Sequence, residues 1–173
     1  MKTNTSKLTF SAVLAAVSVA VLYIATAVGT LQLAAVVLST LAVMLTTKIC
    51  GRKFAFAHYG AVAALLFILL PNKFYAAGYT LFFGLYAIVK SFIEQKNNIK
   101  IEWILKIICF AVISAVFLIG FYIFAAESQK ITGYVYIALF FGEILIMVLY
   151  DVFLSIFGNQ FFVMAEKYLK NLK

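Results

Sequence analysis

The stretch WILKIICFAVISAVFLIGFYIF, residues 103–124, carries a single charged side chain, Lys106. About 20 apolar residues in a helix cross the roughly 30 Å hydrocarbon core of a bilayer, at about 1.5 Å per residue. The run is continuous, whereas strands of membrane barrels alternate apolar and polar side chains over about 10 residues. The stretch therefore predicts a membrane-spanning helix.

The rest of the chain has the same character. Of its 173 residues, 66% are hydrophobic and 12% are charged, against about 45–50% and about 25% in soluble domains. We predict an all-α, polytopic membrane protein, a bundle of six transmembrane helices in one domain covering residues 1–173. The expected spans are residues 8–28, 31–49, 54–70, 74–93, 103–124 and 133–157. Gly158-Asn159 is expected to break the last helix, and residues 160–173 to form an amphipathic end at the interface.

The basic residues behind the net charge of +8 are distributed unequally between the two sides of the predicted bundle. Twelve of the 14 basic residues fall on one side of the six predicted spans, and only Lys73 and Lys130 fall on the other. Because short cytoplasmic loops are rich in Lys and Arg, both termini are predicted to be cytoplasmic. The same residues attract anionic lipid headgroups, so the charge gives no reason to expect a nucleic-acid partner.

Catalytic motifs are absent from the sequence. It has no Walker loop, no GxSxG and no HExxH, so we expect no enzymatic activity, no cofactor and no metal site. The single histidine, His58, is interpreted as an interfacial imidazole bonded to lipid or backbone, in preference to a ligand or base. Cys50 and Cys109 lack CxxC spacing and indicate no disulfide.

Glu143 is the strongest functional candidate. It lies ten residues into the predicted span 133–157, about 15 Å deep and near the bilayer midplane. An ionisable group there costs at least about 2.5 kcal/mol, so it should face the bundle interior or a water-filled cavity. The alternative is a structural carboxyl that is protonated or hydrogen-bonded to a tyrosine. Phe140 lies about one helical turn before Glu143. Asp151 lies nearer the cytoplasmic headgroups and is expected to pair with Lys90 or Lys106.

An aromatic stripe follows the predicted outer corner Leu70-Pro71-Asn72-Lys73. Tyr75, Tyr79, Phe82 and Tyr86 recur on one helical face. Such a stripe can sandwich a flat ring and bond its edges, which makes Asn72, Tyr75 and Tyr79 ligand candidates. An interfacial aromatic belt combined with ordinary bundle packing is the alternative.

Small residues recur along the first span. Ala12, Ala16 and Ala20 stand at every fourth position, and small side chains let membrane helices approach closely. This face either packs on another span of the same chain or docks a partner subunit.

The chain, with its opening residues Lys7-Leu8-Thr9-Phe10-Ser11-Ala12, resembles the substrate-binding S component of energy-coupling factor vitamin transporters of bacteria. The resemblance covers the whole chain in topology. It implies that Ala12, Ala16 and Ala20 dock a transmembrane coupling subunit, and that Tyr75, Tyr79, Tyr122 and Glu143 contact the ligand. The first outer turn, Gly29-Thr30, is short for a gating loop. The chain also resembles uncharacterised membrane proteins of Gram-positive bacteria.

We therefore expect a multi-pass protein of the bacterial cell membrane that binds a small, vitamin-like nutrient. Glu143, Tyr75, Tyr79, Asn72, Tyr122 and Phe140 are the expected ligand contacts. Separate coupling and ATPase subunits would supply the energy, since the chain has no ATP motif. Two alternatives are a structural or assembly subunit of an envelope complex without a small ligand, and a proton-coupled secondary carrier that uses Glu143 as its relay.

Overall fold

The computed structural model describes residues 3–29, 31–96, 98–124 and 133–171, and these ranges contain helices but no strands. Lys2, Lys130 and Lys173, which entered the charge count, lie outside the described residues. The chain divides into two compact units. Unit 1 comprises Met1–Phe92 and Ile156–Lys173, and unit 2 comprises Ile93–Ser155.

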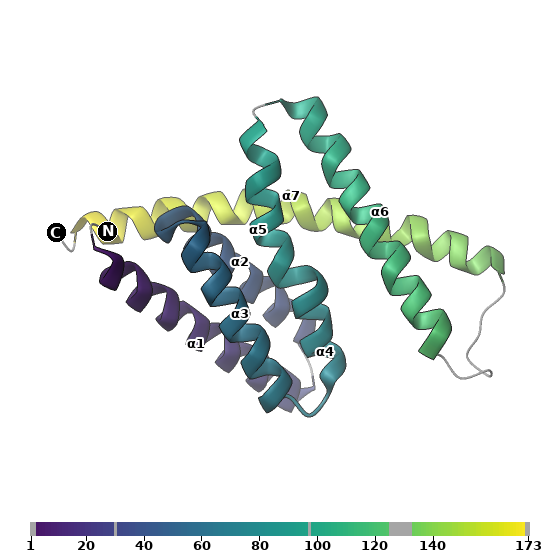
Figure 1. Cartoon of the computed structure of the whole chain (residues 1–173), viewed down its shortest axis with the longest axis horizontal. Helices are drawn as coiled ribbons and strands as arrows, with labels where there is room; N and C mark the ends of the chain where they lie inside the picture. Colours follow the sequence, from purple (N-terminus) through teal and green to yellow (C-terminus); the bar gives the residue numbers. More distant parts are fainter. Residues whose placement is uncertain (1–2, 30, 97, 125–132, 172–173) are drawn as a thin grey trace. The chain divides into compact units, whose positions relative to one another are not determined.

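Unit 1 begins with three helices that pack on one another (Figure 1): α1 (Asn4–Val28), α2 (Gln32–Cys50) and α3 (Arg52–Leu69). Thr3 caps α1 by accepting a hydrogen bond of 3.2 Å from the Ser6 N–H. Gly29 ends α1 with φ 76°, a left-handed conformation that glycine adopts without steric cost. Gly51, with φ 94°, makes the equally tight link from α2 to α3.

The fourth helical stretch contains a π-helical turn. It consists of α4 (Lys73–Gly78), the π-helix η1 (Tyr79–Phe83) and α5 (Gly84–Ile93). Before it, Pro71 ends the helical path and Asn72 caps α4 by accepting a 2.9 Å hydrogen bond from the Phe74 N–H. Lys73 donates to the carbonyl oxygens of Phe67 at 2.6 Å and Leu70 at 2.8 Å, and so satisfies acceptors at the end of α3.

Small and branched side chains fill the core of unit 1. Ala15, Ala35, Ala55 and Ala76 are all buried there, which lets the helix backbones approach closely. Tyr79 is the largest core member, and Tyr59 packs against this cluster.

Unit 2 contains a short 3₁₀ turn, η2 (Glu94–Lys96), the helix α6 (Ile99–Phe124) and part of α7 (Gly133–Asn171). Asn98 caps α6, since its side-chain oxygen accepts from the Lys100 N–H at 3.1 Å. Contacts between α6 and α7 run in antiparallel order, since Lys106 contacts Asp151 and Ser114 contacts Glu143.

The predicted helix break at Gly158-Asn159 is wrong, because α7 continues through both residues to Asn171. A single interior glycine costs a helix only about 1 kcal/mol. A Cβ on Gly158 would lie 2.6 Å from Met44 Sδ, so its missing side chain lets α7 approach α2 within unit 1. Lys48 also donates a 2.6 Å hydrogen bond to the side chain of Asn159.

Five helical stretches in the described ranges are long and apolar enough to cross a membrane: Asn4–Val28, Arg52–Leu69, Lys73–Ile93, Ile99–Gly120 and Gly133–Ala165. The remaining predicted span, 31–49, coincides with α2, whose apolar part Ala34–Cys50 is shorter. The all-helical class with membrane-type helices is thus confirmed. The count of six crossings and the cytoplasmic location of both termini stay predictions.

Candidate functional site

The carboxylate of Glu143 is held on α7 by the hydroxyl of Ser114 on α6. Ser114 donates a hydrogen bond to Glu143 Oε2. Ser114 is fully buried, whereas Glu143 is only partly buried. Among the described residues, Ser114 is the one hydrogen-bonding partner of Glu143, so Oε1 is left for a further contact.

Two more contacts join α6 to α7 along the line where the two helices meet, which we call the α6–α7 seam. Lys106 lies eight residues before Ser114 on α6, and Asp151 lies eight residues after Glu143 on α7. The Lys106 ammonium contacts the Asp151 carboxylate at 2.8 Å. In the other direction, Tyr122 meets Tyr136 edge to face with ring centroids 6.1 Å apart. Rising numbers on α6 pair with falling numbers on α7, which is the register of an antiparallel pair. Eight residues of helix correspond to about 12 Å.

Lys106 is the positive centre of this seam. Its ammonium contacts Asp151 at 2.8 Å and Glu94 at 3.4 Å, and the side chains of Lys106 and Asp151 are 6% and 2% exposed. The predicted pairing of Asp151 with a lysine is confirmed. Lys106 is thereby engaged by two carboxylates, about 12 Å along the seam from Glu143.

Aromatic side chains occur on α6 and α7 on the Tyr122–Tyr136 side of Glu143. Phe140, three residues before Glu143, is partly buried and meets Phe141 edge to face at 5.7 Å between centroids. Tyr122 is 56% exposed. The hydroxyl of Tyr136 is buried and has no hydrogen-bond partner within the described ranges. Sequence reasoning missed this hydroxyl, because spacing alone does not show which tyrosine tip is satisfied.

The other three ligand candidates lie in unit 1. Asn72 is exposed and uses its side-chain oxygen to cap α4. Tyr75 is partly buried beside Phe74, with centroids 5.9 Å apart. Tyr79 is fully buried and stacks on Tyr59 at 6.3 Å. The structure therefore groups Tyr75 and Tyr79 with core packing, and Tyr122, Phe140 and Glu143 with the α6–α7 seam.

Helix α1 has two faces of small residues. The buried face packs within unit 1 and includes Ser11, Ala15, Ser18 and Ala25. Ala12, Ala16 and Ala20 are exposed. The stripe thus divides into one face that the chain itself covers and one that remains accessible.

The interfacial interpretation of His58 is not supported by the structure, in which the ring is 1% exposed inside unit 1. Its Nδ1 lies 3.0 Å from Thr46 Oγ1 and its Nε2 lies 3.5 Å from Ser18 Oγ. The Thr46 hydroxyl donates to the Ala42 carbonyl at 3.0 Å, and the Ser18 hydroxyl donates to the Leu14 carbonyl at 2.9 Å. Each hydroxyl therefore faces the imidazole with the lone pairs of its oxygen. The residue joins α1, α2 and α3. Buried Ser18 and Thr46, polar positions in apolar runs, were the available signal.

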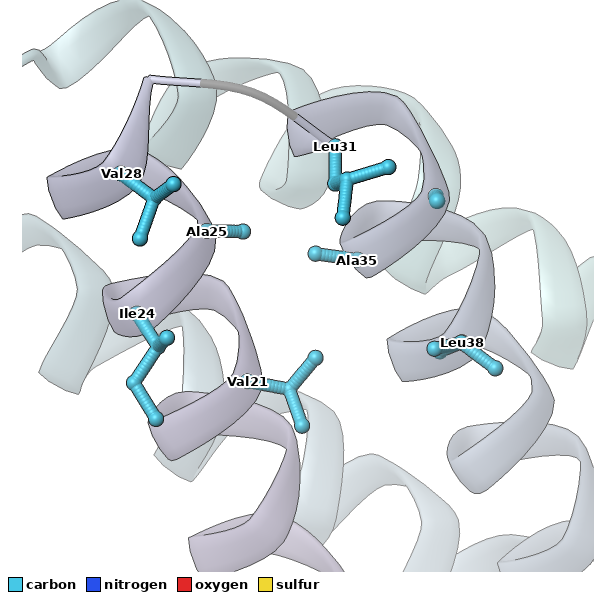
Figure 2. A pocket seen from close by; sticks show the side chains of 8 residues that line it. Val21, Ile24, Ala25, Val28, Leu31, Ala35 and Leu38 are labelled. Carbon is cyan, nitrogen blue, oxygen red and sulfur yellow. The ribbon is translucent and has the colours of Figure 1, made fainter.

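An apolar cavity of about 280 Å³ lies between α1 and α2 beside the link that joins them. Figure 2 shows Ala25 and Ala35 facing each other across it, with Val28 and Leu31 near the link. Its wall consists only of apolar residues: Val21, Ile24, Ala25, Val28, Leu31, Ala34, Ala35 and Leu38. The cavity suits hydrocarbon and offers no group to orient a polar ligand.

No family model, curated protein or solved structure matches the chain. Within the part of the chain that the structure describes, no three His, Cys, Asp or Glu side chains gather closely enough to hold a metal ion.

Proposed function

We propose that this chain is the membrane-embedded binding subunit of an uptake system for a small nutrient, energised by separate coupling and ATPase subunits. The observation that carries the proposal is Glu143. A carboxylate within an apolar helix that crosses a membrane is costly unless it serves a ligand, an ion or a partner. Here it is oriented by Ser114 and remains partly exposed, which is the state expected of a binding group awaiting its ligand.

The exposed face of α1 supports the partner half of the proposal. Ala12, Ala16 and Ala20 present small side chains on the side of α1 that unit 1 leaves uncovered. Close backbone approach is the main source of attraction between helices in lipid. A coupling subunit that packs on this face would transmit its motion to α1 directly.

The experiment that tests the proposal is purification in mild detergent, followed by mass spectrometry of co-purifying small molecules and a thermal-shift screen of vitamins. We expect one class of nutrient to raise the melting temperature, and Glu143→Gln to abolish that rise. If Glu143→Gln leaves the affinity unchanged, Glu143 is not in the site. If nothing binds, the uptake proposal fails.

An assembly subunit is the second candidate function, and burial of the aromatic stripe favours it. Tyr79, Phe82 and Tyr86 are 0%, 9% and 1% exposed, so the protein uses most of this stripe for its own core. Under this alternative, a membrane partner co-purifies in fixed ratio and no small molecule stabilises the chain. Ala16→Leu should remove the partner under either function. In an uptake subunit the same variant should still bind the small ligand.

A further inference from the structure

We propose that the Glu143 end of the α6–α7 seam binds a small organic cation, a protonated amine or quaternary ammonium attached to a ring. This inference rests on the proposed uptake function and names its substrate class. It is carried by the charge and the hydrogen bonding of Glu143, and by the aromatic residues that share its face of α7.

No basic side chain in the described part of unit 2 is bonded to Glu143. Among the described residues, its one bonding partner is the neutral hydroxyl of Ser114. The nearest basic side chain along the seam, Lys106, already contacts Asp151 and Glu94. A carboxylate at membrane depth gains most from a cation that it does not have to share.

Ser114 fixes the geometry of that interaction. It is fully buried on α6, so the packing around it restricts the movement of its side chain. Because it donates to Oε2, the lone pairs of Oε1 are available for an ammonium or another N–H group. A carboxylate that is held in place loses little rotational freedom when it binds.

The rings on the same face of α7 add affinity for a cation. Tyr136, Phe140 and Glu143 stand at positions i, i+4 and i+7, one above another on the helix. Ring faces attract ammonium groups by about 0.5–2 kcal/mol, more when water is excluded. Anions are repelled by both the rings and the carboxylate, so the combination selects charge as well as shape.

The hydroxyl of Tyr136 sets the outer limit of the site. It is buried and lacks a partner in the described ranges, and a buried hydroxyl without a partner is costly. Along the axis of α7, the backbones of Tyr136 and Glu143 are seven residues apart, about 10 Å. A ligand that carries an ammonium at one end and a polar atom at the other satisfies both groups.

Three probes of one shape test the charge requirement: benzylammonium, benzyl alcohol and benzoate, titrated calorimetrically into the purified full-length protein at pH 7. We expect benzylammonium to bind at least tenfold more tightly than benzyl alcohol, and benzoate not to bind. Glu143→Gln should weaken benzylammonium at least tenfold and leave benzyl alcohol unchanged. Glu102→Gln, a carboxylate near the start of α6, is the matched control and should change neither.

Equal affinity for benzylammonium and benzyl alcohol would overturn the cation class while leaving the uptake proposal standing. So would a vitamin screen that finds a neutral or anionic ligand. The comparison among probes uses the unaltered protein, so it decides the question even if Glu143→Gln does not fold. Tyr136→Phe provides a second readout, because it should spare benzylammonium, which has no second polar atom, and weaken 4-hydroxybenzylammonium.

Discussion

Replacing Gly84 by alanine tests whether the Tyr79 ring belongs to the core or is free to receive a ligand. A Cβ at position 84 would lie 2.8 Å from two ring atoms of Tyr79 and 2.9 Å from Tyr59 Cδ2. Ordinary carbon contacts are about 3.5–4.0 Å, so the rings would have to retreat by about 1 Å. Both are restrained, since Tyr79 is fully buried and the Tyr59 hydroxyl donates to the Thr80 carbonyl at 2.7 Å.

Two opposing terms set the size of the effect. Overpacking of this kind costs about 1–3 kcal/mol, whereas alanine gains up to about 1 kcal/mol over glycine in a helix. Gly60→Ala in α3 is the matched control, because nothing lies within 4 Å of its added Cβ. The helix term cancels between the two variants, so Gly84→Ala should be less stable than Gly60→Ala by about 1–3 kcal/mol.

Thermal unfolding of the two variants in the same detergent measures this difference. Gly84→Ala combined with Tyr59→Phe should lose less than the two single losses together, because the Tyr59 ring is then released from the Thr80 carbonyl. Equal melting temperatures for Gly84→Ala and Gly60→Ala would refute the reasoning. The Tyr79 ring would then be loosely held, and its assignment to the ligand site would regain support.

Three further variants test the polar contacts, each by unfolding in detergent. Lys106→Met should destabilise by about 3 kcal/mol, because it breaks the buried pair with Asp151; Glu94→Gln should cost less than about 1 kcal/mol, since Glu94 is 35% exposed. Thr46→Val should cost about 1–2 kcal/mol through His58; Thr40→Val, whose hydroxyl bonds only within its own helix, should cost less. Lys73→Met should cost about 1 kcal/mol by freeing two carbonyls at the end of α3, and equality with the exposed Lys53→Met would contradict this role.

The class of the protein and most helix bounds could be predicted from sequence, because the length of an apolar run is a local property. The predicted spans 8–28 and 103–124 fall inside α1 and α6. Gly158 shows the limit of such reasoning. A glycine followed by asparagine is a common helix terminator, but the contact with Met44 depends on a partner helix far away in sequence.

The candidate site was partly predictable for the same reason. The position of Glu143 in an apolar helix and its nearness to Phe140 follow from the sequence alone, whereas its depth in the bilayer stays a prediction. The hydrogen-bonding partner of Glu143 could not be predicted in this way, because Ser114 meets Glu143 only through the register of α6 against α7. The aromatic stripe was predicted on one face of the helix, and Tyr79, Phe82 and Tyr86 are all buried. Periodicity shows that side chains share a face, whereas burial shows what that face contacts.

The polar groups in the apolar helices separate into two kinds, and the difference carries the functional argument. His58 is buried, and both of its ring nitrogens contact hydroxyls from neighbouring helices. The hydroxyls of Ser39 and Thr47 return to carbonyls of their own helix. The fold itself supplies the contacts of these polar groups, so helix packing accounts for their presence. Glu143 is bonded through one oxygen and is still partly exposed. Within the described residues no basic side chain bonds Glu143, and this is the observation on which we base the proposal of a cationic ligand.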